Sequence, residues 1–205
     1  MGSFYQSSGQ TDHWETIFYS DKVFSYYTSA EGNPASNWRT PDFNDSAWRT
    51  GKGGIGYDDN DDNTTIEKCI SVCLRTSFQL SEIDKITEAV LNIDYDDAFV
   101  AYLNGVEIAR SAGLTGNFPE ATQISSSNHE AKIYSGGLPE SFFISKDKLS
   151  AVLAEGKNVL AVQVHNSSVN SSDMSSNIFF SVGIEDSQTR YLSNPSWFSA
   201  PVVLV

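Results

Sequence analysis

Residues 98–110 read AFVAYLNGVEIAR, and this stretch decides the fold class. Two apolar runs flank the dipeptide Asn104-Gly105. Both residues tolerate the positive φ that a two-residue type I′ turn demands. Apolar runs on both sides of Asn-Gly are the strongest short-range signal of a β-hairpin. The stretch therefore predicts two adjacent antiparallel strands.

Strand patterns run through most of the remaining chain, with connections rich in Gly, Ser, Asn and Asp. The clearest is ISVCLRTSFQL at residues 70–80, where apolar and polar residues alternate as in a half-buried strand. Helical character is restricted to residues 145–156, with Ser145 as N-cap and Gly156 as C-terminal stop. This balance predicts an all-β protein, an antiparallel β-sandwich. Further strands are expected at residues 13–19, 22–27, 88–95, 140–145, 157–166 and 177–185.

The chain length suits one domain with a substantial core. We expect that domain at residues 14–190, after a linker at 1–13. Residues 191–205 are expected to form a C-terminal edge strand or a linker to a following domain. Three long irregular regions, 31–66, 111–130 and 166–176, should gather at the ends of the sheets, where binding sites usually lie.

The charge of the chain excludes several kinds of partner. With 26 acidic and 13 basic residues the net charge is −13, which repels nucleic acid and anionic membrane surfaces. No apolar run approaches the roughly 20 residues of a membrane span, so membrane insertion is not expected. The first residues lack the basic and apolar regions of a signal peptide. We expect a monomer.

Motifs of common catalytic sites are missing from the sequence. Its histidines His13, His129 and His165 lack metal-binding spacing, and there is neither a nucleophile elbow nor a phosphate-binding loop. We expect no enzymatic activity. Cys69 and Cys73 would lie roughly 13 Å apart on a straight strand, too far for a disulfide, and could bridge only if the chain turns between them. That question stays open.

A run of acids and amides at residues 58–63, DDNDDN, is a candidate calcium site. Ca²⁺ takes six to eight oxygen ligands, and a flexible loop can supply several of them. The alternative is a solvated, turn-rich loop, because Asp and Asn also favour turns. Two further adjacent acids, Asp96 and Asp97, directly precede the predicted hairpin. The candidate calcium ligands are Asp59, Asp61, Asp62, Asn63, Asp96 and Asp97.

A second polar segment, HNSSVNSSD at residues 165–173, follows a predicted strand. Its hydroxyls and amides suit hydrogen bonding to sugar hydroxyls and equally suit a loop without a ligand. Of the four tryptophans, most are expected in the core, although an exposed one could stack on a sugar ring. The candidate sugar-binding residues are Trp38, Tyr57, Asp58, Asp59, Asn60, His165, Asn166, Ser172 and Asp173.

Four segments together resemble a known family. FNDSAWRTGKGGIGYDDNDDNTT, ISVCLRTSF, DYDDAFVAYLNGVEIAR and GKNVLAVQVHNSSVNSSDMS occur in an order and spacing similar to the galactose-binding-like modules of large secreted bacterial proteins. The resemblance covers residues 14–185 and looks closest to modules beside CotH-type, lamin-tail and polysaccharide-degrading domains. This chain departs from the family pattern at Asp58 and Asn60, where such modules tend to have glycine.

The resemblance implies a jelly-roll sandwich, often with a structural Ca²⁺, that serves as a non-catalytic carbohydrate-binding module. We accordingly expect an extracellular or cell-surface accessory module of a secreted bacterial protein, binding a polysaccharide or oligosaccharide beside other domains of the same parent. The alternatives are a protein- or peptide-binding adhesin module and a structural spacer next to a catalytic domain.

Overall fold

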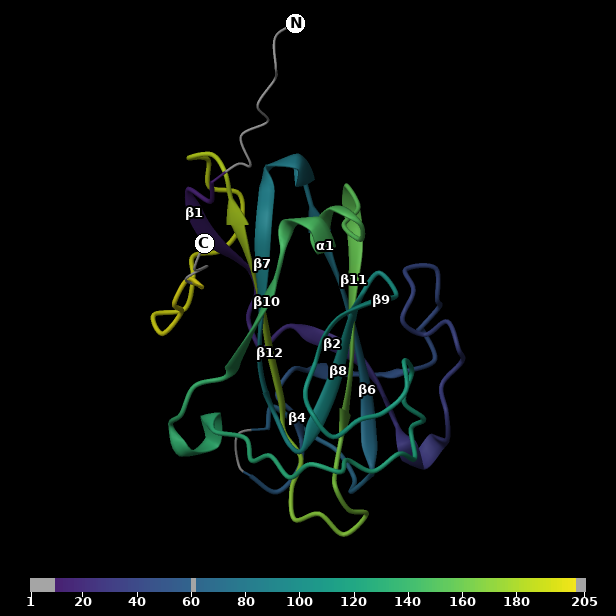
Figure 1. Cartoon of the computed structure of the whole chain (residues 1–205). Coiled ribbons are helices and arrows are strands. Elements are labelled where there is room, and N and C mark those ends of the chain that lie inside the picture. Colours follow the sequence, from purple (N-terminus) through teal and green to yellow (C-terminus); the bar gives the residue numbers. More distant parts are fainter. Residues whose placement is uncertain (1–9, 60–61, 202–205) are drawn as a thin grey trace, which may run out of the picture.

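Two antiparallel sheets pack face to face in the computed structural model, which describes residues 10–59 and 62–201 (Figure 1). One sheet has the strand order β1-β12-β7-β10 and the other β3-β2-β6-β11-β8-β9. The antiparallel β-sandwich predicted from the sequence is confirmed. The larger sheet contains β2 (Val23–Thr28), β3 (Arg49–Lys52), β6 (Ser71–Leu80), β8 (Ala98–Leu103), β9 (Val106–Arg110) and β11 (Gly156–His165). The smaller contains β1 (His13–Phe18), β7 (Ile86–Tyr95), β10 (Glu140–Ile144) and β12 (Ser176–Ile184).

The predicted hairpin is confirmed as β8 and β9, joined by Asn104 at φ 50° and Gly105 at φ 89°. The Asn104 side chain also ties the turn to β11 and to the segment that precedes β11. Its amide nitrogen donates to the Val152 carbonyl at 2.8 Å, and its oxygen accepts from the Val159 N–H at 2.8 Å. One residue therefore fixes both the turn and its place on the sheet.

Both faces of the larger sheet are covered, contrary to the half-buried strand predicted at residues 70–80. The inner face packs into the main core between the sheets. The outer face carries a second apolar cluster, in which Trp38 and Tyr102 pack beside β8. Arg75 on β6 is 3% exposed, and its guanidinium donates to the Asp45 carboxylate at 3.0 Å and to the carbonyls of Trp38 and Thr40. It thereby pins the segment 38–45 across the outer face.

The predicted helix is shorter than expected. α1 spans Lys146–Ser150, and Gly156 begins β11 at φ 83° instead of ending the helix. The cause is a local side-chain contact: the Asn158 side chain accepts from the Ala154 N–H at 2.9 Å and donates to the Ala154 carbonyl at 2.7 Å. These bonds hold the preceding residues in a turn. None of the helices in the described residues is long and apolar enough to cross a membrane.

Several short elements connect the strands of the two sheets, and two of them, β4 (Ile55–Gly56) and β5 (Thr64–Thr65), lie in the region 31–66 that was expected to be irregular. β4 and β5 form a small parallel pair, and the 3-10 turns are η1 (Ser29–Glu31), η2 (Ile83–Lys85) and η3 (Ile133–Ser135). Residues 191–201 form no strand. Their one ladder contact is a bridge between Leu192 and Thr16, so the edge strand expected there is absent from this described part.

Cys69 and Cys73 are free and buried, which answers the question that their spacing left open. Burial raises the pKa of the Cys69 thiol to about 12 and moves that of Cys73 in the same direction. Both thiols are therefore protonated and chemically inert at neutral pH.

Candidate functional site

One end of the sandwich collects three connections that are distant in sequence. They are the β7–β8 turn at Asp96-Asp97, the β11–β12 loop at residues 166–175, and the segment after β9 that contains Glu130 (Figure 1). Backbone bonds fix their relation: the Asp97 N–H donates to the His165 carbonyl at 2.9 Å, and the Asp96 N–H to the Ser175 carbonyl at 3.3 Å. We call this end the acidic rim.

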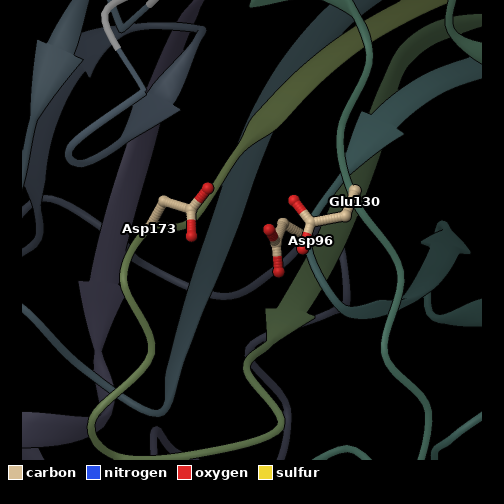
Figure 2. A group of neighbouring side chains, drawn as sticks. All are labelled: Asp96, Glu130 and Asp173. Carbon is tan, nitrogen blue, oxygen red and sulfur yellow. The ribbon is translucent and has the colours of Figure 1, made fainter.

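Asp96, Glu130 and Asp173 bring their carboxylates together at the acidic rim (Figure 2). Each offers one oxygen, and these three oxygens lie within 4.8 Å of one another. Asp96 is 3% exposed, Asp173 is partly buried and Glu130 is exposed. Burial of Asp96, together with the charges of Asp97, Asp173 and Glu130, raises its pKa to about 8. None of the three carboxylates forms an ion pair with a described residue, and Lys68, which reaches the loop that carries Asp173, donates to the Ser171 and Ser172 carbonyls and pairs with Asp58 instead.

The cluster has the chemistry of a hard-cation site. Ca²⁺ binds carboxylate oxygens at 2.3–2.6 Å, so two ligands on opposite sides of one ion lie about 5 Å apart. The three oxygens all lie within 4.8 Å of one another, so one ion could contact all of them. The Asp96 carboxylate accepts no backbone N–H and forms no ion pair among the described residues, so it is available as a ligand. Three carboxylates from three connections would be joined by one ion.

Asp97, which was predicted as a calcium ligand together with Asp96, has a different role. Its Oδ1 accepts from the His129 N–H at 3.0 Å and its Oδ2 from the Ser167 N–H at 2.6 Å. Asp94 acts similarly and accepts from the N–H groups of Lys132 and Ile133 at 2.9 and 2.8 Å. These carboxylates tie neighbouring loops to the sheet, and Asp97 is not among the three clustered residues.

The acidic loop lies next to the same rim. Tyr57 and Met174 exchange backbone bonds of 3.0 and 3.2 Å, and Asp59 accepts a short hydrogen bond from Ser175. Asn63 donates to the Gly53 carbonyl at 2.7 Å. The carboxylate of Asp62 packs against Gly56, where a Cβ would approach Asp62 Oδ1 to 2.5 Å.

None of the described residues of this loop belongs to the carboxylate cluster. Asp59, Asp62 and Asn63, predicted as calcium ligands, thus lie outside it. Asp58 is exposed and pairs with Lys68 at 3.4 Å. Two further predicted residues, Asn60 and Asp61, lie outside the described part of the chain.

Three predicted sugar-binding residues are interior. Tyr57 is 2% exposed, and His165 and Asn166 are fully buried. The Asn166 amide donates to the Tyr57 hydroxyl at 2.7 Å and to the Cys69 carbonyl at 3.0 Å, while His165 Nδ1 bonds the Gln123 carbonyl at 2.7 Å. These three side chains do not face solvent, and their hydrogen bonds hold the loops of the acidic rim in place. Ser172, also predicted, is exposed and donates to Asp173 at 2.5 Å.

A separate cleft of about 310 Å³ opens on the outer side of the larger sheet, and we call it the aromatic cleft. Phe118 is 56% exposed beside it, and the Arg39 guanidinium lies 4.0 Å from the centre of the Phe118 ring. Trp38, a predicted sugar-binding residue, lines the cleft but is only 2% exposed, because its ring packs against Trp48 and Tyr102. The lining residues are Asn33, Pro34, Ser36, Trp38, Arg39, Phe118, Pro119, Glu120 and Gln163.

Sequence reasoning missed Glu130, Arg39, Phe118 and Gln163. Phe118 had a usable signal, since a large apolar ring in the polar stretch GNFPE cannot be explained by a strand pattern. Glu130 had none, because a single acid in a polar loop has no distinguishing neighbour. Gln163 lies within a strand pattern, and only the packing of two loops over β11 gives it a place in the cleft.

Comparison with known proteins gives matches to the fold alone. No protein-family model and no curated protein sequence matches the chain. Among solved structures, it is similar to a β-glucuronidase from glycoside hydrolase family 2, with 15% identity, a TM-score of 0.52 and coverage of 84% of this chain and 18% of the enzyme. The β-glucuronidase of Bacteroides uniformis has 12% identity, a TM-score of 0.53 and coverage of 83% and 18%.

A β-glucuronidase from an uncultured Clostridium species gives 12% identity, a TM-score of 0.50 and coverage of 90% and 31%. At these identities the likeness concerns the fold. The chain spans less than a third of each of these enzymes. It thus has the β-sandwich fold of a domain that occurs within larger glycoside hydrolases, and the CotH-type and lamin-tail setting of the family resemblance remains an expectation.

Proposed function

We propose that this chain is a non-catalytic carbohydrate-binding accessory module. The observation that carries the proposal is the aromatic cleft, where an exposed ring lies beside several hydrogen-bonding side chains. The C–H face of a pyranose is apolar and its edge carries hydroxyls. A sugar site therefore needs one aromatic surface and a few well-placed polar groups.

Phe118 can supply the aromatic surface. Arg39 lies over its ring at 4.0 Å, and 56% of the side chain is still exposed. Glu120 and Asn33 are joined by a short hydrogen bond, and Asn33 Oδ1 accepts from the Ala121 N–H at 2.7 Å. These contacts hold residues 33 and 118–121 against each other, so the cleft is formed before a ligand arrives.

The acidic rim supports calcium as a structural ion in this function. Asp96, Glu130 and Asp173 would hold it, and its two positive charges would offset most of the negative charge of three carboxylates from separate connections. It would supply no chemistry beyond that neutralisation and the joining of the loops. Stability should rise with added Ca²⁺, because an ion that binds only the folded state stabilises it by mass action. The melting temperature in EDTA and in millimolar Ca²⁺ tests this, and equal values would contradict it.

We also place the module outside the cell, as part of a longer secreted bacterial protein. The longer parent is supported by the fold, which occurs as one domain inside larger glycoside hydrolases. The secreted setting rests on the family resemblance of the sequence. Other domains of the parent would supply catalysis, while this module would hold the assembly on its carbohydrate.

A glycan array and affinity electrophoresis against plant, algal and bacterial polysaccharides test the function. We expect retention by at least one carbohydrate, and loss of retention in Phe118→Ala. The matched control is Phe143→Ala, since Phe143 is an exposed phenylalanine on β10 of the opposite sheet. No retention across a broad panel would refute the proposal. Equal loss in both variants would place binding elsewhere.

A further inference from the structure

Arg39 differs from the other arginines of the chain. Four of the five form ion pairs, as between Arg49 and Glu31 at 2.9 Å and between Arg190 and Asp186 at 2.7 Å. Arg39 forms no ion pair with any described residue, although acids outnumber bases two to one in the chain. Its charge is therefore left uncompensated in a strongly acidic protein.

Aromatic rings and one carbonyl hold the Arg39 guanidinium. The Ser36 carbonyl accepts from Nη2 at 2.8 Å, and the Phe118, Tyr102 and Trp38 ring centres lie 4.0, 5.2 and 5.6 Å away. Burial lowers the pKa of Arg39, although a guanidinium remains charged at any physiological pH. The stacking fixes the orientation of the planar group and leaves further N–H donors free.

A second polar group in the aromatic cleft also lacks a partner. Gln163 is 2% exposed on β11 and lines the cleft, yet its side-chain amide forms no hydrogen bond with the described residues. A fixed cation and an unpaired amide at one aromatic cleft are suited to an anionic, hydroxyl-bearing ligand.

We propose that the aromatic cleft binds a uronate-containing oligosaccharide, with Arg39 binding the sugar carboxylate. Guanidinium and carboxylate match in geometry and form two parallel hydrogen bonds. The uronate ring stacks on Phe118, and the Gln163 amide bonds a hydroxyl or the carboxylate. This inference rests on the proposed carbohydrate-binding function and narrows its ligand to acidic sugars.

The test compares oligogalacturonate and oligoglucuronate tetrasaccharides with cellotetraose and with methyl-esterified oligogalacturonate, by isothermal titration calorimetry. The methyl ester keeps the rings and removes the charge. We expect an acid tetrasaccharide to bind the wild type most tightly. Arg39→Gln should weaken that binding by about tenfold to hundredfold, the usual effect of losing a hydrogen bond between charged groups. The same substitution should leave binding of the methyl ester unchanged.

Arg49→Gln is the matched control, because it causes the same change in net charge at an exposed ion pair outside the aromatic cleft. It should leave all affinities unchanged, and melting curves check that both variants fold. If the esterified and neutral sugars bind as tightly as the acids, and Arg39→Gln has no selective effect, the uronate inference is wrong while carbohydrate binding stands. If no sugar binds at all, both fall.

Discussion

Replacing Asp96 with asparagine should have opposite effects with and without calcium. Asp96 is 3% exposed and its pKa is raised to about 8, first by burial and then by the carboxylates of Asp97, Asp173 and Glu130. In the unfolded chain its pKa is near the ordinary value of 3.8. The folded protein therefore binds more protons than the unfolded chain between about pH 4 and pH 8. Without a cation, its free energy of unfolding falls as the pH rises through that window.

The size of the effect follows from the pKa difference. At pH 7 the carboxyl must stay protonated about three pH units above its unfolded pKa, and each unit costs about 1.4 kcal/mol. The penalty is at most about 4 kcal/mol, and Asp96→Asn removes most of it. For a chain of this length, about 4 kcal/mol corresponds to roughly 10 °C in melting temperature.

Thermal melting at pH 7 in EDTA and in millimolar Ca²⁺ measures both effects. In EDTA the variant should melt higher than the wild type. In calcium the wild type should gain about 3 kcal/mol at a hundredfold excess over its dissociation constant. The variant should gain much less, since it lacks the most buried ligand. Asp84→Asn, at an exposed side chain on η2, controls for the loss of one negative charge.

Two results would refute this reasoning. If Asp96→Asn lowers the melting temperature in EDTA, the buried carboxylate is not a source of instability. If wild type and variant gain equally from calcium, the ion binds elsewhere, and the acidic loop at residues 58–63 becomes the alternative location.

Three further substitutions test the fold. Burial lowers the pKa of His165 from 6.5 to about 4, so the stability that its neutral form provides above pH 6.5 is lost as the pH falls toward and through 4. The drop in unfolding free energy between pH 7 and pH 4, measured by urea denaturation, should therefore shrink by about 3 kcal/mol in His165→Gln. Arg75→Met should cost about 3 kcal/mol by the same assay, because it removes the donor to the Trp38 carbonyl and the ion pair with Asp45. Arg49→Met at an exposed pair should cost under about 1 kcal/mol. Asn104→Ala should cost about 2 kcal/mol, since alanine tolerates positive φ poorly and loses the bonds to β11; a change within about 0.5 kcal/mol would contradict the role given to this side chain.

Local sequence patterns predicted the strands well and the helix poorly. The hairpin at Asn104-Gly105 and the strand ranges follow from neighbours along the chain, since turn conformation and side-chain alternation are local properties. The helix at 145–156 failed because Asn158 captures the backbone of Ala154. Arg75 likewise reads as a solvent-facing residue until the segment 38–45 covers it.

Each candidate site likewise contains residues that the sequence indicated and residues that only the structure revealed. The sequence singled out Asp96 as a cation ligand and Asp173 as a sugar ligand, and the structure places both in one cluster. It could not supply Glu130, an isolated acid in a polar loop. Trp38 was a candidate because tryptophan can stack on a sugar ring. Its burial and the exposure of Phe118 depend on how two loops cross the sheet.

The sequence by itself determined that this protein is an antiparallel β-sandwich with polar loops and a strongly acidic surface. The strands and loops follow from the local preferences of neighbouring residues, and the acidic character follows from the total charge of the side chains. Only the tertiary structure decided which carboxylates meet at the acidic rim and which groups line the aromatic cleft. Each site combines segments far apart in the chain, and the distance between their side chains is set by strand order and loop packing, which no short stretch of sequence encodes.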